Sequence, residues 1–316
     1  MIKVDHLTKS FVRYTKMGRV RRSRTLVTAV DEISMSIQAG EMVGYIGANG
    51  AGKSTTIKML TGILAPTSGT VSVAGLTPLD DRVALARKIG VVFGQRSQLW
   101  WDLPLRDSFD LLRHIYRVSA ADHLSTRTGL IDTFDVGSFL DTPVRQLSLG
   151  QRMRGELVAS LLHRPSVLFL DEPTIGLDVV SKYAVREALA ALNRDDGVTV
   201  VLTTHDLTDI EQLCQRVIII DGGKLVADEA LATLKSRQGG QRTMIVDLDR
   251  AMPALVIEGV DCTGIDGPRQ WLSFSPPLTA ADVLAAVSAA ADVRDLTMVE
   301  PDIESIVRDI YNTHPA

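Results

Sequence analysis

The hydrophobic and polar positions near the N-terminus alternate with a period of two. Ile2 and Val4 begin this pattern, and apolar residues recur at alternate positions in Val27, Ala29, Ile33, Met35 and Ile37. A period of two predicts half-buried strands. Between these stretches, residues 9–24 carry seven lysines and arginines and no acid. This basic segment is interpreted either as a solvated hairpin loop or as a contact for phosphate groups, lipid headgroups or a partner.

A different pattern begins at residue 42, where short, wholly apolar runs alternate with segments of helical period. Such runs predict strands that are buried on both faces of a sheet; they occupy 42–46, 89–93, 167–170, 198–203 and 217–220. The amphipathic segment 53–64 predicts a helix that ends near Pro66. The alternation predicts an α/β fold with a largely parallel sheet covered by helices.

Two regions depart from this alternation. Residues 103–163 have helical patterns without a convincing strand, so we expect an inserted helical subdomain over about 96–165. A polar, glycine-containing break predicts a linker over 236–241, and hence one domain over 1–235 and a small α+β domain over 242–316. The small domain is predicted as strand, strand, helix, strand, helix, with Pro301 as the first residue of the last helix.

The composition is that of an ordinary globular protein. The 316 residues are 45% hydrophobic and 23% charged, which excludes a disordered chain. With 34 basic and 38 acidic residues the net charge is −4, which argues against a nucleic-acid partner. Cys214 and Cys262 form neither a disulfide framework nor a zinc site, as suits a reducing compartment.

No segment is expected to cross a bilayer. The longest stretch of small apolar residues, 283–291, lies between Asp282 and Asp292. It is much shorter than the roughly 20 residues that a spanning helix needs. The N-terminus carries Asp5 and no apolar core, so it is not interpreted as a signal peptide.

Residues 47–54 form a glycine-rich loop between a predicted strand and a predicted helix. Their sequence, Gly-Ala-Asn-Gly-Ala-Gly-Lys-Ser, matches the pattern G-x-x-x-x-G-K-[ST]. Glycines let the backbone N–H groups approach phosphate oxygens, and the helix N-terminus adds positive potential. Lys53 is expected to reach the β- and γ-phosphates, and Ser54 to offer its hydroxyl oxygen to Mg²⁺. The sequence therefore predicts a nucleotide-binding domain.

A second candidate site lies at the end of a later strand, where the apolar run 167–170 is followed by Asp171 and Glu172. A carboxylate at the end of a parallel strand beside a phosphate loop is well placed to hold Mg²⁺. The adjacent Glu172 suits a general base that polarises an attacking water.

Four further motifs complete an ordered set. Gln95 follows a strand, Leu147-Ser148-Leu149-Gly150-Gln151-Arg152 precedes the two acids, Pro173-Thr174-Ile175-Gly176-Leu177-Asp178 follows them, and His205 comes after the next strand. This order over about residues 1–235 resembles the ATPase subunit of ABC transporters. The resemblance implies a P-loop NTPase fold with an antiparallel N-terminal β part. It also implies a head-to-tail dimer that holds two ATP molecules between the phosphate loop of one subunit and the signature segment of the other.

The resemblance also assigns roles to residues. Glu172, His205 and Gln95 would be catalytic, and Ser54, Gln95 and Asp171 would hold Mg²⁺. Phe11, with Tyr14 as the alternative, would stack on adenine, while Ser148 and Gly150 would contact the γ-phosphate in trans. The implied nucleotide-binding set is completed by Gly47, Asn49, Gly50, Gly52, Lys53, Thr55, Gln151 and Asp178. Phe11, Gln95 and His205 also have structural interpretations, as a core aromatic, a solvated glutamine and a surface histidine.

One position departs from the family pattern, because Leu149 stands where the signature usually has its first glycine. Gly150, which is expected to approach phosphate most closely, is retained. We therefore expect the trans contacts to remain, with a change in dimer affinity or hydrolysis rate. Intact Glu172 and Lys53 argue against a regulatory protein without ATPase activity.

The segment from Val91 to Asp102, together with the signature, is similar to ATPase subunits of ABC-2-type exporters. This resemblance implies that polytopic membrane permease subunits contact residues 95–102, and that the chain acts at the cytoplasmic face of the membrane. Trp100 and Trp101 are adjacent, so they cannot share one buried face; they are interpreted either as part of that contact or as ordinary packing. An importer ATPase, and a soluble ABC ATPase acting on ribosomes or DNA, are the alternatives.

Overall fold

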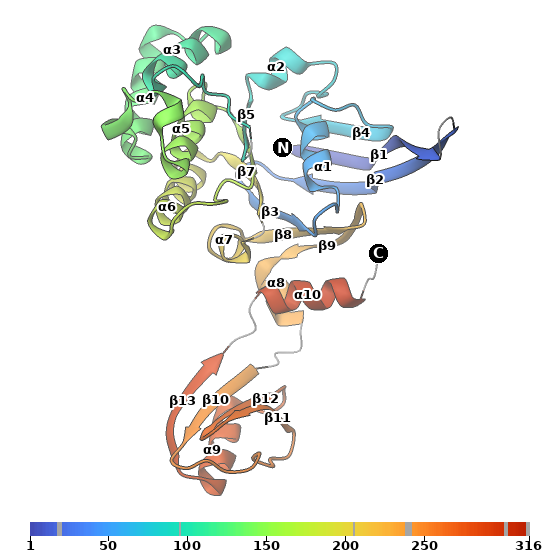
Figure 1. Ribbon diagram of the computed structural model, residues 1–316, viewed down its shortest axis with the longest axis vertical. Coiled ribbons are helices and arrows are strands. Elements are labelled where there is room, and N and C mark those ends of the chain that lie inside the picture. The colour runs from blue at the N-terminus through green and yellow to red at the C-terminus, as the bar shows by residue number, and fades with distance from the viewer. Residues whose placement is uncertain (18–20, 95, 205, 238–241, 300–302, 314–316) are drawn as a thin grey trace. The chain divides into compact units, whose positions relative to one another are not determined.

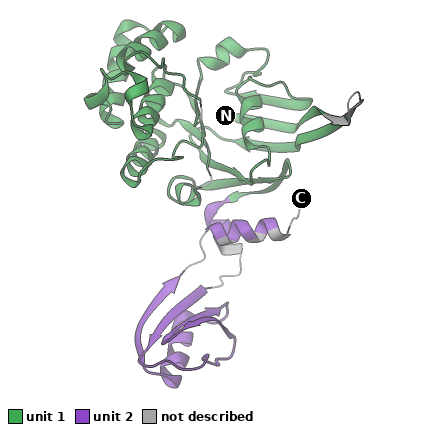
Figure 2. Ribbon diagram, in the orientation of Figure 1, with its two compact units in different colours: residues 1–229, 316 green, residues 230–315 purple. Residues whose placement is uncertain are grey.

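The computed structural model describes residues 1–17, 21–94, 96–204, 206–237, 242–299 and 303–313. The chain divides into two compact units, residues 1–229 and residues 230–315 (Figure 2).

A six-stranded sheet forms the centre of the first unit, with the strand order β5-β6-β7-β3-β8-β9 (Figure 1). Neighbouring strands from β5 to β8 in this order run parallel. Their side chains are buried on both faces, which explains why the sequence shows wholly apolar runs here rather than alternation. The strands are β3 (Met42–Gly47), β5 (Ile89–Phe93), β6 (Val167–Asp171), β7 (Thr199–Thr203), β8 (Arg216–Asp221) and β9 (Lys224–Ala230).

An antiparallel sheet of order β2-β1-β4 forms the N-terminal part, with β1 (Ile2–Met17), β2 (Arg21–Ile37) and β4 (Ser68–Val73). Pairing with β4 ends at Thr8, and β1 and β2 continue as a two-stranded ribbon. The basic segment is therefore mostly strand, and its interpretation as a loop was wrong. Cross-strand pairs such as Val12 with Leu26 and Tyr14 with Arg24 are exposed, so the ribbon accepts charged residues without burying them.

Helices surround the central sheet, and Figure 1 shows α3, α4 and α5 grouped away from the antiparallel sheet. Residues 103–163, all of which the structure describes, contain no strand, which agrees with the predicted helical insertion. The helix after the phosphate loop ends at Leu60, four residues before the predicted Leu64, because Gly62 takes a left-handed φ of 75°. The helices are α1 (Lys53–Leu60), α2 (Arg82–Ala86), α3 (Leu105–Tyr116), α4 (Ala120–Thr133), α5 (Leu149–Leu161), α6 (Val179–Asp196) and α7 (Leu207–Leu213), with 3₁₀ turns η1 (Gly137–Phe139) and η2 (Val144–Gln146).

The second unit is an antiparallel sheet of order β11-β12-β10-β13 with helices. Three strands precede the helix α9, so the prediction of two was wrong by one strand. Gly267, at φ 58°, makes a tight turn between β11 and β12. Because β11 is largely polar and exposed, its sequence has no apolar pattern that would predict a strand. Pro301 lies outside the described residues. The elements are α8 (Leu231–Arg237), β10 (Arg242–Leu248), β11 (Val260–Asp266), β12 (Arg269–Phe274), α9 (Ala280–Ala290), β13 (Val293–Val299) and α10 (Ile303–Thr313).

Each unit has its own hydrophobic core. In the first unit the core joins both sheets to α1 through residues such as Ile33, Ile57 and Phe169. In the second unit Val246, Leu272 and Val287 pack the sheet against α9. Across the described part of the chain, no helix combines the length and the apolar character needed to cross a membrane.

Candidate functional site

The phosphate loop lies between the end of β3 and the start of α1, as the sequence predicts. Gly52 precedes α1 with a φ of 106°, in the left-handed region. A Cβ atom at this position would collide with the carbonyl oxygen of Ala29 on β2. Only glycine therefore fits here, because the backbone conformation and the close approach of β2 both exclude a side chain.

Lys53 bends back over this loop. Its side chain is buried, with 7% of its surface exposed, and Nζ donates hydrogen bonds to the carbonyl oxygens of Gly47, at 2.5 Å, and Ala48, at 3.1 Å. Burial lowers the pKa of Lys53, while the nearby carboxylates of Glu172 and Asp171 oppose that shift. The loop thus holds an ammonium group among backbone oxygens, where a phosphate could exchange for them.

Asp171, the last residue of β6, joins three elements. Ser54 Oγ, in the first turn of α1, donates to Asp171 Oδ2 at 3.1 Å, and Thr203 Oγ1, at the end of β7, donates to Oδ1 at 2.6 Å. A cavity of about 330 Å³ opens beside this group, lined by Ser54, Asp171 and Glu172. The structure therefore brings the two candidate sites of the sequence together.

Glu172 has an unusual backbone. Its φ is 58°, a left-handed value that is costly for a residue other than glycine. The structure holds this conformation with a hydrogen bond from Glu172 N–H to the carbonyl oxygen of Thr203, at 2.9 Å. On the other side, a Cβ on Gly94 would come within 2.8 Å of the Glu172 carbonyl oxygen, so the chain after β5 passes close by. The left-handed backbone therefore fixes the direction in which the chain turns at Glu172, immediately after β6.

Three further residues shape this site and were missed in the sequence. Lys58 and Arg96 line the cavity, and Thr203 orients Asp171. Lys58 stands four residues after Ser54, on the same face of α1, which is a signal that helical spacing could have given. Gln95 and His205, both predicted to be catalytic, lie outside the described residues.

The aromatic candidate Phe11 is exposed on β1, with Lys9 Nζ 5.2 Å from the centre of its ring. Its partner across the ribbon is Val27, two residues before Ala29, whose carbonyl oxygen lies against Gly52. Phe11 is therefore paired with a residue of β2 that lies two positions from the contact between β2 and the phosphate loop. Tyr14 lies three residues further along β1 and is also exposed.

The signature segment begins α5. Ser148 is the N-cap: its Oγ accepts the N–H of Gln151 at 3.2 Å, and Gln151 Oε1 accepts the N–H of Ser148 at 2.9 Å. This capping box fixes the first turn of α5. A Cβ on Gly150 would lie 2.7 Å from Ser181 Oγ, so Gly150 allows the start of α6 to approach.

Asp178 is the N-cap of α6, and it accepts hydrogen bonds from Ser181 N at 2.9 Å and Ser181 Oγ at 2.8 Å. The backbone N–H and then the hydroxyl of Ser181 lower the pKa of Asp178. Since Ser181 also borders Gly150, the structure places Asp178 beside the signature segment of the same chain.

Leu149, the departure from the family pattern, lies over Gly176, where an added Cβ would be 2.6 Å from its Cδ2. Its side chain remains 37% exposed, and the start of α6 exposes further large apolar side chains, among them Val179 at 83%. We call this exposed apolar group the signature patch; it consists of Leu149, Ile175, Val179, Val180 and Tyr183. Contiguous exposed apolar residues of this kind mark interaction surfaces.

The phosphate loop and the signature segment belong to two separate groups of residues. Among the described residues, no hydrogen bond or ion pair joins Gly47–Ser54 to Leu147–Arg152. One group carries a loop, a lysine and carboxylates, and the other carries a capped helix end with apolar neighbours.

Comparisons with known proteins agree with this geometry. A family model described as "ABC transporter" matches residues 30–175, which include the phosphate loop, the signature segment and both acids. A daunorubicin resistance ATP-binding protein of Streptomyces coeruleorubidus is 31% identical over 88% of this chain and 89% of its own length. The chain belongs to the family of ABC transporter ATP-binding proteins. It is therefore an ABC-type ATPase, as the resemblance of its motifs predicted.

This ABC ATPase is also similar to an export ATP-binding protein in sequence and to two solved ABC cassettes in structure. A Nod factor export ATP-binding protein of Paraburkholderia xenovorans (strain LB400) is 35% identical over 71% of this chain and 73% of its own length. The solved structure of a dimeric bacterial ABC transporter cassette aligns with a TM-score of 0.63 and 29% identity, over 73% of this chain and 99% of that one. A dimeric cassette in a post-hydrolysis state, bound to ADP and Pi, aligns with a TM-score of 0.63 and 28% identity, over the same 73% and 99%.

The two adjacent tryptophans of the ABC ATPase are both partly exposed, Trp100 at 37% and Trp101 at 53%. The guanidinium of Arg152, on α5, lies 5.9 Å from the ring centre of Trp101. Trp100 N–H donates to Ser108 Oγ at 3.2 Å. The backbone of Trp100 is thus fixed to α3 and the Trp101 ring lies against Arg152 of α5, while both residues keep part of their surface in solvent.

A buried carboxylate supports the loop that follows Glu172. Asp209, on α7, is fully buried and accepts hydrogen bonds from the hydroxyls of Thr174 and Thr204, and it pairs with Arg186 of α6. The same side chain therefore bonds to the segment after β6, to the segment after β7 and to α6.

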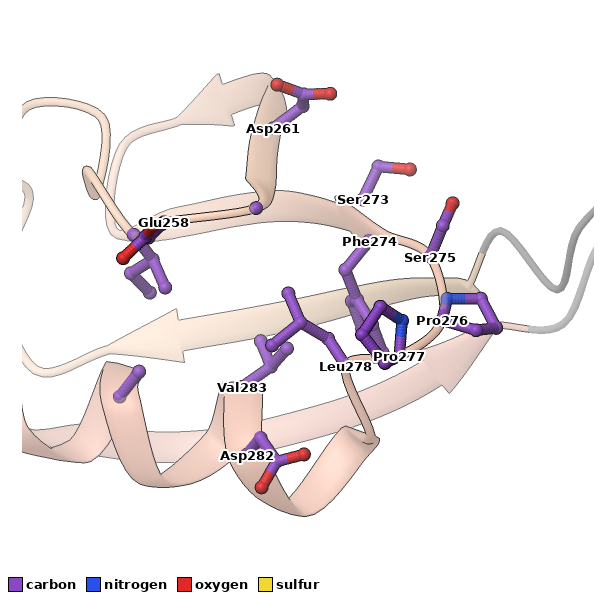
Figure 3. Close-up of a pocket in the computed structure, with 13 residues that line it drawn as sticks. Glu258, Asp261, Ser273, Phe274, Ser275, Pro276, Pro277, Leu278, Asp282 and Val283 are labelled. Atoms are coloured by element: carbon purple, nitrogen blue, oxygen red, sulfur yellow. The ribbon is translucent and has the colours of Figure 1, made fainter.

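The second unit of the ABC ATPase contains a cavity of about 790 Å³ between β12 and α9 (Figure 3). Phe274, Leu278 and Val283 contribute apolar lining, and Glu258, Asp261 and Asp282 contribute carboxylates. None of the residues that the sequence assigned to nucleotide binding lies in it.

Proposed function

We propose that this ABC ATPase is the energy-coupling subunit of an exporter. It binds ATP and Mg²⁺, hydrolyses ATP at a head-to-tail dimer interface, and drives separate polytopic membrane subunits from the cytoplasmic face of the membrane. The observation that carries the proposal is the link between Ser54 and Thr203 through Asp171, with Glu172 as the next residue. It assembles the phosphate loop and the hydrolytic acids around one cavity.

The residues of this site fit a magnesium ion. The Ser54 hydroxyl and the Asp171 carboxylate supply hard oxygen ligands that already converge within 3.1 Å, and Mg²⁺ is usually held by one or two such groups plus phosphates and water. Thr203 fixes the carboxylate by donating to its other oxygen. The ion, when bound, would neutralise charge on the β- and γ-phosphates.

The proposed chemistry assigns each side chain a task. Lys53 binds the β- and γ-phosphates in place of the carbonyl oxygens of Gly47 and Ala48. Glu172 orients a water and takes its proton as the water attacks the γ-phosphorus, and the bond to the bridging oxygen of ADP breaks. Lys58 and Arg96 add positive charge at the cavity. The resemblance assigns Gln95 to the ion and the water, and His205 to the γ-phosphate.

The dimer is supported by the separation of the two groups of residues. A complete site needs donors on both sides of the triphosphate, and no hydrogen bond or ion pair among the described residues joins the phosphate loop to the signature segment of the same chain. The signature patch offers apolar surface for a second subunit, either another copy or a homologue. In this arrangement Ser148, Gly150 and Gln151 face the ATP held by the partner, Phe11 stacks on adenine, and Asp178 orders the loop between the two sites.

Trp100 and Trp101 are proposed to contact the membrane subunit. Aromatic side chains with a fixed backbone and exposed rings are typical anchors of an interface. The relatives whose names refer to drug resistance and to Nod factor export support export rather than import.

Replacement of the proposed general base tests the catalytic assignment. Glu172→Gln is expected to lower ATP hydrolysis at least about 100-fold, the size of a lost general base, while ATP binding remains. With ATP, the variant should form a stable dimer in light scattering. Glu187→Gln, at an exposed position on α6, is the matched control and should hydrolyse ATP normally. Unchanged hydrolysis by Glu172→Gln would show that the assignment is wrong.

A further inference from the structure

One face of α5, which begins in the signature segment and is called the signature helix below, packs against residues 97–105. Arg152, Gly155 and Glu156 stand at positions i, i+3 and i+4 of α5, so they share one face. Each contacts a different part of the segment that contains Trp100 and Trp101. The contacts are a buried hydrogen-bonded carboxylate, a close approach at a glycine and an arginine over an indole ring.

Glu156 makes the polar contact. It is buried, with 4% of its surface exposed. Its carboxylate accepts hydrogen bonds from the hydroxyl of Ser97 and from Gln98 N–H, the latter at 3.2 Å. Gln98 Nε2 in turn donates to the backbone carbonyl oxygen of Glu156 at 3.1 Å. Two consecutive residues of the segment are thus bonded to one residue of the helix.

The other two contacts bring the segment close along its length. A Cβ on Gly155 would lie 2.8 Å from Leu105 Cδ2 and 3.4 Å from Leu99 Cδ1, so the absence of a side chain allows both leucines to approach α5. Leu99 and Leu105 are buried there. One turn towards the start of the helix, Arg152 lies over Trp101.

From these contacts we infer that Glu156 is a positioning residue that makes the segment 97–101 and the signature helix move as one body. The inference rests on the proposed function, in which Trp100 and Trp101 meet the membrane subunit and Ser148 meets ATP on the second subunit. The helix α5 is continuous from Leu149 to Leu161, so a shift of Ser148 is carried to Glu156 and then to Ser97 and Gln98.

The chemistry of the contact explains why a carboxylate suits this position. Two donors, one hydroxyl and one N–H, converge on it, and a carboxylate accepts from both. An apolar side chain of similar size would leave the buried N–H of Gln98 without an acceptor, which is costly. A glutamine preserves the bonds, because its carbonyl accepts the N–H of Gln98 and its NH₂ donates to the Ser97 hydroxyl, which rotates.

The test uses the tryptophans as reporters in the full chain. The chain has three, so Trp271→Phe leaves only Trp100 and Trp101. Their emission is followed while a non-hydrolysable ATP analogue is added with Mg²⁺. Glu156→Leu removes the link, Ser97→Ala removes one of its bonds, and Glu156→Gln keeps it. Ser160→Ala is the matched control: Ser160 is buried on the same helix, but it donates to Leu157 within α5.

We expect the nucleotide to change the emission of the parent, Glu156→Gln and Ser160→Ala alike. In Glu156→Leu the change in emission on nucleotide binding should be at least about fivefold smaller than in the parent, because fivefold is the lower end of typical couplings between sites. The change in Ser97→Ala should lie between those of the parent and Glu156→Leu. Hydrolysis should show the same order: kcat falls about tenfold in Glu156→Leu with little change in KM, because the contact acts in the closed state.

The outcomes separate the inference from the function on which it rests. If Glu156→Leu and Ser97→Ala bind nucleotide and give the full emission change of the parent, or if the parent gives none, Glu156 does not couple the two elements. If Glu156→Leu does not fold, the Ser97→Ala result decides alone. If the parent neither binds nor hydrolyses ATP, the proposed function falls, and the inference with it.

Discussion

Thr174 Oγ1 donates a hydrogen bond of 2.5 Å to Asp209 Oδ2, although the two residues are 35 positions apart in the chain. Thr174 follows Glu172 by two residues, and Asp209 lies on α7 beyond the position of His205. The bond therefore links the loop after Glu172 to α7, the helix that follows the next strand. The same carboxylate also accepts from Thr204 and pairs with Arg186, so one buried side chain holds three segments.

Asp209→Ala should therefore destabilise the first unit and slow hydrolysis. The change leaves Arg186 without its buried partner, and breaking such a pair costs about 3 kcal/mol. Denaturant unfolding measures the loss of free energy of unfolding, and steady-state kinetics measures the loss of kcat. Asp195→Ala, which breaks the exposed pair with Arg194, serves as the control and should change neither. Equal behaviour of the two variants would contradict the structural role of Asp209.

Thr203→Val should weaken the response to Mg²⁺. Valine has the same shape but cannot donate to Asp171, and loss of such a supporting bond typically reduces metal affinity about tenfold or more. The Mg²⁺ concentration for half-maximal ATP hydrolysis should rise accordingly.

Thr199→Val on the same strand is the matched control for this variant. Thr199 is also fully buried, but its hydroxyl accepts the N–H of Gly40. Both variants should lose about 1 kcal/mol of unfolding free energy, the net value of one hydrogen bond. Only Thr203→Val should shift the Mg²⁺ titration, and a shift in both or in neither would argue against the assignment of Asp171.

Leu149→Ala should weaken the dimer that forms with ATP. Leu149 belongs to the signature patch. If truncation of this apolar side chain costs about 1.4 kcal/mol of binding free energy, the affinity of the dimer falls about tenfold. Sedimentation of the Glu172→Gln chain with ATP, with and without the second change, gives the two dissociation constants. Leu124→Ala removes an exposed leucine from α4 instead and should leave the constant unchanged. A tighter dimer in Leu149→Ala would mean that the leucine obstructs closure.

Glu156→Gln should change how stability depends on pH. Burial raises the pKa of Glu156 above its ordinary value of 4.5, and the hydrogen bonds from Ser97 and Gln98 and the charge of Arg152 oppose that shift only in part. The folded chain therefore binds this proton more tightly than the unfolded chain. The resulting stability is complete below pH 4.5 and is lost as pH rises through the folded pKa.

Glutamine cannot titrate, so the unfolding free energy of the parent should fall relative to that of Glu156→Gln as the pH rises above 4.5 and through the folded pKa. Chemical unfolding of the two proteins in the same buffers measures this difference. Ser160→Ala, which replaces a buried residue of the same helix that does not titrate, should show the same trend as the parent. A difference that stays flat with pH would mean that burial does not perturb Glu156.

The sequence predicts the central sheet well because strands buried on both faces leave wholly apolar runs. Ile89–Phe93 is strand β5 with the predicted bounds, and the other four runs differ from their strands by one or two residues. The phosphate loop is equally predictable, because its glycines, lysine and serine stand next to one another in the chain. Structural features that depend on local periodicity or on a contiguous motif can therefore be predicted from the sequence.

Signals that depend on distant neighbours were absent from the sequence. The loop interpretation of the basic segment was wrong because strand residues such as 11–14 and 24–28 are exposed and show no alternation of buried and exposed positions. The sequence does not predict β11 because Val260 is its only buried residue. Thr203 and Asp209 gained roles only when the fold brought Asp171 and Thr174 to them. Helical spacing does not predict the role of Glu156, because its partners Ser97 and Gln98 are nearly sixty residues away in the chain.

The capping box at the start of α5 decides which hydrogen atoms the signature segment turns outward. Ser148 Oγ already accepts the N–H of Gln151, and the N–H of Ser148 is already bound to the Gln151 side chain. The protons left at this helix end are those of the Ser148 hydroxyl and of the N–H groups of Leu149 and Gly150. The first turn of α5 therefore presents hydrogen-bond donors at its tip. Such an end accepts an anion and repels a cation, whichever chain supplies the phosphate.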